Sequence, residues 1–249
     1  MVGGGGGQLA AWWAMYSSTS DFQGAAAIQA EQAAFMRKVY AIMAAGLALT
    51  GAVAFGVSLN AGLVRSLFVD HRWILYVLLG VEFLMVISFA AVAQRSSALV
   101  AGALFFSYAA VNGVTFSVVF LRYTTESIAS TFFITGGTFA VMSGWGYVTK
   151  RELSGLGHFA MMGLVGLLLA SLVNFFLKSE MVYWLTTFMG IIVFTGLTAY
   201  DTQRIKELNV LGNAGTDEDH KEAIHGALVL YLDFVNLFLE LLRLFGRRR

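Results

Sequence analysis

The feature that most constrains this chain is a series of long apolar stretches joined by short polar segments. A helix that crosses the hydrocarbon core of a bilayer needs roughly 20 mostly apolar residues. Seven stretches meet that requirement: residues 39–59, 73–93, 98–121, 128–148, 159–177, 182–202 and 224–245. This pattern predicts an all-α membrane protein whose seven helices form one compact bundle, because the connecting segments are too short to hold a soluble domain.

Composition excludes several classes of function. Hydrophobic residues make up 58% of the chain and charged residues 12%, against about a quarter in a soluble domain. The net charge of +1 provides no field for nucleic acid, and the chain has no cysteine for thiolate chemistry. The histidines lack the spacing of a zinc site, and no phosphate loop or nucleophile motif is present. We therefore expect no enzyme activity, no cofactor and no nucleic-acid partner.

The chain divides into two parts by composition. Residues 1–34 are glycine-rich and polar and are predicted to be a flexible cytoplasmic tail, followed by the transmembrane domain over residues 35–249. Lysine and arginine favour the cytoplasmic side of short loops. With the amino terminus inside, the inner segments hold eight such residues and the outer loops four. The inner set is Arg37, Lys38, Arg95, Lys150, Arg151, Arg204, Lys206 and Lys221, and the outer set is Arg65, Arg72, Arg122 and Lys178.

The carboxyl terminus does not fit this orientation. Seven crossings would place Arg247, Arg248 and Arg249 outside the cell. Either this end is an exception to the charge rule, or the last segment is re-entrant and returns to the cytoplasmic side. The charge rule otherwise predicts a multi-pass protein of the inner membrane with a cytoplasmic amino terminus.

Ionisable residues inside the apolar stretches are the candidate functional residues, because a charge in hydrocarbon is costly. Glu82 lies in the second stretch, Asp201 at the end of the sixth, and Asp233 and Glu240 in the seventh. Asp233, Asn236 and Glu240 follow at intervals of three and four residues, which places them on one face of a helix. The last helix is therefore predicted to be surrounded by the others.

Three of these residues also have simpler interpretations. Asp201 is suited to marking the membrane boundary, and Glu82 is suited to a structural hydrogen bond. Glu240 is spaced to pair with Arg243, three residues further on. Asp233 has no adjacent base and lies well inside an apolar run, so the functional interpretation is strongest there.

Three motifs resemble those of the transmembrane Bax inhibitor motif family. They are FTGLTAYDTQ at residues 194–203, ALVLYLDFVNLF at residues 227–238 and GWGYVTKREL at residues 144–153. The resemblance covers residues 35–245. It implies two layers of three helices around a central carboxy-terminal helix, and a pH-sensitive calcium leak across the membrane.

The resemblance also implies roles for particular residues. The sensor of the family is a pair of aspartates on the last two helices, which correspond to Asp201 and Asp233 here. An acidic residue and an arginine on the second helix correspond to Glu82 and to Arg95, the candidate latch for Asp201. Bacterial relatives of this kind imply an alternative function, a regulatory protein that binds a membrane protease or another membrane protein.

The chemistry of the residues supports a proton-regulated ion pathway. Two carboxylates in a poorly hydrated site cannot both ionise at low cost, so the pair is expected to gain and lose a proton near neutral pH. Calcium prefers several oxygen ligands. Asp201 and Asp233 are therefore predicted to bind calcium transiently, with Glu82, Asn236 and Glu240 along the pathway.

Overall fold

The structure is a computed structural model that describes the backbone of residues 5–71 and 73–249. Side chains are described from residue 26 onward, except at 61, 72, 90, 93 and 94. Within these residues seven helices have 19 residues or more: α1 (Gly5–Ser58), α3 (Trp73–Arg95), α4 (Ala98–Phe116), α6 (Thr125–Val148), α7 (Ser154–Leu177), α8 (Glu180–Leu208) and α9 (Asp217–Phe245). Shorter elements are α2 (Ala61–Arg65), the π-helix η1 (Ser66–Asp70) and α5 (Val119–Arg122). The predicted helices are confirmed at all seven stretches.

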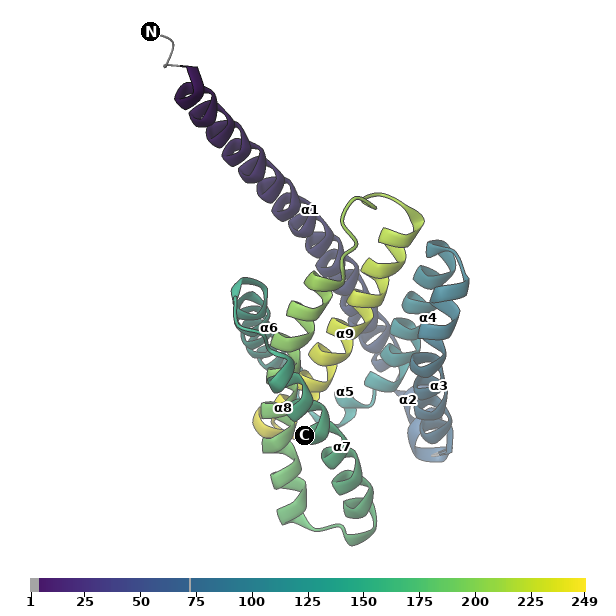
Figure 1. Ribbon diagram of the computed structural model, residues 1–249. Coiled ribbons are helices and arrows are strands. Elements are labelled where there is room, and N and C mark those ends of the chain that lie inside the picture. The colour runs from purple at the N-terminus through teal and green to yellow at the C-terminus, as the bar shows by residue number, and fades with distance from the viewer. Residues whose placement is uncertain (1–4, 72) are drawn as a thin grey trace.

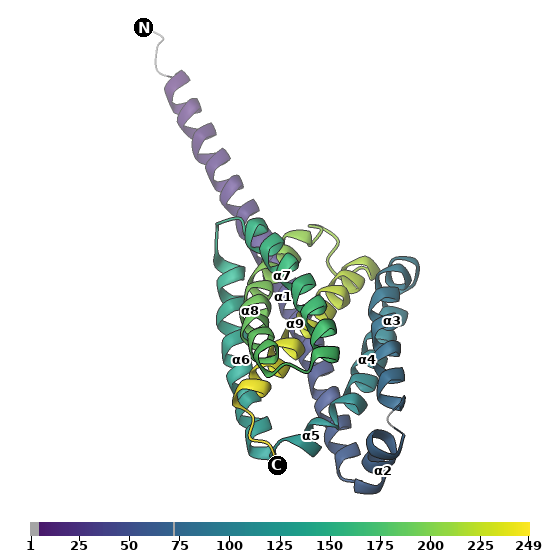
Figure 2. The same cartoon turned by 90° about the horizontal axis from the view of Figure 1, so that it is seen from below.

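Helix α9 lies at the centre of the bundle, as predicted. It packs against α1, α3 and α4 on one side and against α6 and α8 on the other (Figures 1 and 2). Within the first group α4 contacts both α1 and α3, and within the second α8 contacts both α6 and α7. The described part of the chain therefore has two groups of three helices with the carboxy-terminal helix between them.

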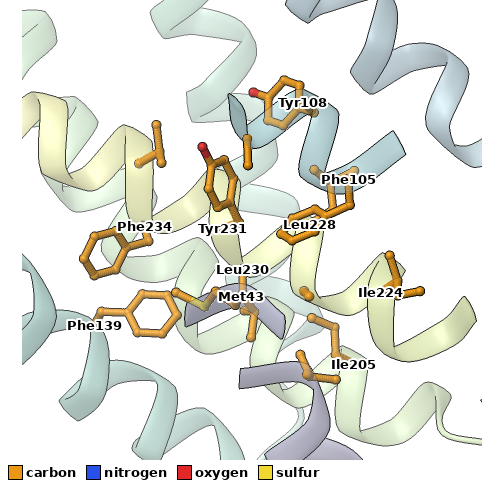
Figure 3. Packing of buried hydrophobic residues seen from close by; sticks show 14 of the residues in the cluster. Met43, Phe105, Tyr108, Phe139, Ile205, Ile224, Leu228, Leu230, Tyr231 and Phe234 are labelled. Atoms are coloured by element: carbon orange, nitrogen blue, oxygen red, sulfur yellow. The ribbon is translucent and has the colours of Figure 1, made fainter. Parts of the chain in front are cut away.

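Aromatic side chains on α9 bind it to both groups (Figure 3). The ring of Tyr231 meets that of Tyr108 on α4 at 5.8 Å between centroids, and the ring of Phe234 meets that of Phe139 on α6 at 5.6 Å. Tyr231 is fully buried and Phe234 nearly so. Because edge-to-face contacts fix the ring positions, these residues define the register of α9 against its neighbours.

Only some of the seven long helices are apolar enough, by composition alone, to span a membrane. Among the described residues four helices are long and apolar enough to span a membrane: Ala26–Ser58, Ala98–Arg122, Ser154–Leu177 and Glu180–Leu208. The stretches Gly62–Asp70 and Trp73–Phe89, bent by 87°, would make a fifth. Helix α6 buries serine and threonine, and α9 carries charged residues, so both are less apolar. Their polar side chains are tolerated because neighbouring helices cover them.

The carboxyl terminus lies at the end of the bundle opposite the start of α9. The backbone N–H of Thr124 donates to the carbonyl of Arg247 at 3.0 Å, and that of Arg249 donates to the carbonyl of Arg122 at 2.9 Å. At the other end, Asp217 accepts a hydrogen bond from the N–H of Ala98, where α4 begins. Helix α9 therefore runs the length of the bundle without turning back, which contradicts the re-entrant alternative.

This arrangement weakens the charge argument for orientation. Arg247, Arg248 and Arg249 lie at the same end as Arg122, so they belong with the four basic residues assigned to the outer loops. Of those four, Arg72 lies outside the described residues. The count of basic residues thus changes from eight inner and four outer to eight inner and seven outer. A cytoplasmic amino terminus stays a prediction.

The segment expected to be a separate tail continues the first helix. Helix α1 begins at Gly5 and extends well past the other helices (Figure 1). Residues 1–4 lie outside the described residues. The mobility of residues 1–34 stays a prediction.

Candidate functional site

The two aspartates predicted to act together lie side by side in the structure. Asp233 on α9 is 5% exposed, and the half-buried Asp201 on α8 lies within hydrogen-bonding reach of it. A hydrogen bond between two carboxyl groups requires a proton on one of them, because a carboxylate only accepts. A proton on one member of this pair, the aspartate dyad, would let that member donate to the other.

Few other groups in the described part of the chain stabilise charge on the dyad. Oδ2 of Asp233 is buried and has no hydrogen-bond partner among the described residues. The hydroxyls of Thr198 and Thr202 donate to carbonyls of their own helix, at Phe194 and Thr198. Their protons are thereby used, so neither hydroxyl donates to the dyad.

A glycine allows α6 to approach α8 beside the dyad. A Cβ at Gly146 would collide with the backbone carbonyl of Ala199, two residues before Asp201. Larger residues would hold the two helices apart. The motif at residues 144–153 therefore acts through close packing against the motif at residues 194–203.

A chain of hydroxyl groups crosses three helices next to the dyad. Tyr40 on α1 hydrogen-bonds to Ser143 on α6 at 2.6 Å, and Ser143 hydrogen-bonds to Thr202 on α8 at 2.8 Å. Ser143 and Thr202 are buried. Sequence reasoning missed this chain, although small hydroxyl residues within apolar helices are a signal for such contacts.

Glu82 belongs to a second polar cluster, on the α3–α4 side of α9. It is 8% exposed and accepts a hydrogen bond from the Thr115 hydroxyl at 2.5 Å. On α4, which also carries Thr115, the Asn112 amide donates to the Tyr108 hydroxyl at 3.2 Å. The Asn112 Oδ1 has no partner among the described residues. The structural hydrogen bond considered for Glu82 is thus present, and no described contact joins Glu82 to the dyad.

Arg95 does not latch onto Asp201 in this structure. Its side chain is exposed at the end of α3, and none of the ion pairs found among the described residues includes it. The basic residue whose charge acts on Asp201 is Arg204, one turn further along α8. The spacing of sequence motifs could not show that the end of α3 is separated from α8 by α9 and α4. A latch in another helix arrangement stays a prediction.

The polar face predicted for α9 does not form a continuous row of free groups. The Asn236 amide donates to the carbonyl of Leu232 at 2.8 Å. Glu240 pairs with Arg243 at 2.8 Å, as its spacing allowed, and packs against Gly190 of α8. Only Asp233 on this face meets a second carboxyl group.

The dyad offers a cation few ligands. Among the residues described, no group of three or more histidine, cysteine, aspartate or glutamate side chains is placed to hold a metal ion. Two carboxyl groups supply fewer oxygens than the six to eight that calcium takes. Any calcium at the dyad would retain much of its water and leave readily.

An ion pair that the sequence did not reveal closes one end of the bundle. Lys38 on α1 donates to Asp219 in the first turn of α9 at 2.5 Å, and the Gly215 N–H donates to the same oxygen at 2.7 Å. Burial by itself would raise the pKa of Asp219, but these two hydrogen bonds hold that pKa below its ordinary value. This Lys38–Asp219 clamp joins α1 to α9.

This chain is similar in sequence to known proteins over most of its length. The family model described as "Inhibitor of apoptosis-promoting Bax1" matches residues 32–249. Inner membrane protein YbhL of Escherichia coli strain K12 is 47% identical over 216 residues, which is 86% of this chain and 92% of that protein. An uncharacterized protein of Borreliella burgdorferi is 39% identical over 215 residues, 86% of this chain and 92% of its own length. The matched region contains the dyad and the Lys38–Asp219 clamp.

Proposed function

This chain belongs to the Inhibitor of apoptosis-promoting Bax1 family, and on that premise we propose that it is a non-enzymatic, proton-regulated cation pathway, with calcium as the ion that passes. The observation that carries the proposal is the contact between Asp201 and Asp233 inside the bundle. A membrane protein rarely buries two acidic groups against each other without a functional reason.

The proposed switch is the proton in the dyad. While one carboxyl group is protonated, it donates to the other and joins α8 to α9. Loss of that proton leaves two negative charges in contact, and their repulsion favours a second arrangement in which the two helices separate. Ionised carboxylates would also attract a divalent cation, so one proton controls both the helix contact and the affinity for the ion.

The test is calcium flux into liposomes that contain the purified protein, measured with an entrapped indicator from pH 5 to pH 8. Asparagine at position 201 can donate to Asp233 through its amide N–H at any pH, and asparagine at 233 can do the same for Asp201. Asp201→Asn and Asp233→Asn should therefore give, at every pH, the flux that the unmodified protein shows at the acidic end of the range.

The matched control is Asp70→Asn. Asp70 is an exposed carboxylate whose ion pair with Arg65 is long, at 3.9 Å. This variant should keep the pH response of the unmodified protein. A pH response that survives in both dyad variants would rule out the dyad as the sensor.

The first helix favours a second candidate function, a regulatory protein that binds a membrane protease or another membrane protein. The backbone of helix α1 extends past the bundle, where a partner could reach it (Figure 2). Deletion of residues 2–30 leaves the hydrogen bond from Gly212 to Glu31 intact. Under this candidate the deletion should abolish co-purification of the partner. If the chain is an ion pathway alone, the deletion should leave the calcium flux unchanged.

We also propose that the protein resides in the bacterial inner membrane with its amino terminus in the cytoplasm. The name of the Escherichia coli relative and the apolar helices support the membrane, and the count of basic residues only weakly supports the orientation. In this topology α9 makes the seventh crossing, so reporter enzymes fused at the two termini should report opposite sides. Equal activity of one reporter at both ends would exclude this topology.

A further inference from the structure

A cavity of about 500 Å³ lies between α1 and α6, on the side of the bundle away from α3 and α4. Its walls are residues 33–40 of α1 and 139–147 of α6, and most of the lining is apolar, including Met36, Phe139, Ala140 and Gly144. The Tyr40–Ser143 hydrogen bond joins the two walls. The cavity is thus a slot between two helices, with hydrocarbon side chains along its length.

One cation lines this slot. Arg37 is exposed, and none of the ion pairs found among the described residues uses it, whereas its neighbour Lys38 is bound to Asp219. A second cation lies close by, because the Lys206 ammonium sits 4.8 Å from the ring centre of Tyr147, another lining residue. Among the residues whose side chains the structure describes, no carboxylate lines the cavity. The part of the slot near Arg37 and Lys206 therefore has the charge to bind an anionic group.

The slot lies at the level where a lipid headgroup would be. Arg37 and Tyr147 are close to the end of the bundle where α6 finishes and α9 begins, and Tyr40 and Phe139 lie further toward the middle. Basic residues at a membrane surface attract anionic lipids, and a guanidinium binds phosphate in a bidentate manner. The polarity of the slot therefore runs in the same direction as that of a lipid molecule.

We propose that this α1–α6 slot binds one anionic phospholipid, with its phosphate on Arg37 and an acyl chain between Met36 and Ala140. The lipid would lie beside the Tyr40–Ser143–Thr202 chain, and so next to the residue that follows Asp201. The proposal concerns a binding site and does not depend on ion conduction.

The test measures lipid retained by the purified full-length protein, by native mass spectrometry after exchange into detergent with phosphatidylglycerol or phosphatidylcholine. The unmodified protein should retain phosphatidylglycerol in preference to phosphatidylcholine. Arg37→Gln should weaken phosphatidylglycerol binding about tenfold, the equivalent of one charge-assisted hydrogen bond. Arg37→Lys should restore part of it. Because Arg37 is exposed, neither variant should prevent folding.

A steric variant tests the chain-binding part of the slot. A side chain at Gly144 meets open space, so Gly144→Leu can fill the slot without a backbone collision. Gly166→Leu on α7 is the matched control, because Gly166 is also exposed and open but lies outside the slot. Gly144→Leu should abolish lipid retention, and Gly166→Leu should leave it unchanged.

Equal retention of the two lipids, no loss in Arg37→Gln, or full retention in a folded Gly144→Leu protein would each overturn the proposal. Competition with inorganic phosphate separates a lipid site from a simple anion site. Displacement of the lipid by millimolar phosphate would show that the headgroup alone binds, and it would contradict a site built for the acyl chain.

Discussion

The Lys38–Asp219 clamp is expected to contribute measurably to stability, and Asp219→Asn tests it. The Asp219 side chain is 4% exposed and that of Lys38 is 31% exposed, so the pair is shielded from water on one side only. A hydrogen bond to a charged group contributes about 1.5–3 kcal/mol, and partial exposure places this one near the lower limit. We expect Asp219→Asn to lower the free energy of unfolding by about 1.5 kcal/mol at pH 7.

The sign of the pH dependence follows from the depressed pKa of Asp219. Its carboxylate is stabilised in the folded state, so the contribution is fully present above the unfolded value of about 3.9 and is lost as the pH falls through the lower folded pKa. The difference between the unmodified protein and Asp219→Asn should therefore be constant from pH 7 to about pH 5 and should shrink below about pH 4.

Unfolding in mixed micelles, followed by tryptophan fluorescence, measures both quantities. Glu218→Gln is the control, because Glu218 is 67% exposed and lies 3.5 Å from Lys221, which should contribute only about 0.3 kcal/mol. If Asp219→Asn unfolds like Glu218→Gln at pH 7, or if its stability difference persists unchanged in acid, the reasoning about the clamp is refuted.

Two further predictions concern packing. Gly146→Val should destabilise the bundle by about 2 kcal/mol or more, because its Cβ meets the Ala199 carbonyl and backbone cannot move aside cheaply; Gly144→Ala, which meets open space, is the control in the same thermal-unfolding assay. Tyr231→Phe should cost about 1 kcal/mol, because it removes the buried 2.7 Å hydrogen bond to Thr50 but retains the ring contacts. A Gly146→Val protein as stable as Gly144→Ala would show that α6 and α8 do not need this close approach, and an unchanged Tyr231→Phe protein would show that the hydroxyl is dispensable.

The candidate site was predicted in part. Asp233 stood out because an unpaired acid in an apolar run is costly, and its partner Asp201 followed from the family motif. Glu240 was paired correctly with Arg243 from local spacing alone. The pairing of Arg95 with Asp201 is not found in this structure. The distance between them depends on how α3 packs in the bundle, and the sequence carries no measure of that distance.

The sequence by itself determined the helices, the membrane class and the central position of α9. These properties depend on interactions between a residue and its neighbours three or four positions away, or between a side chain and the bilayer, and both are local. Tertiary structure alone decided which helices meet: the Lys38–Asp219 clamp joins residues 181 positions apart, and the Tyr40–Ser143 bond joins residues 103 apart. Such contacts depend on where small residues let backbones approach and on the register of buried rings. Many arrangements of apolar helices would be equally stable in the bilayer, so only the packing of the bundle selects one set of polar partners.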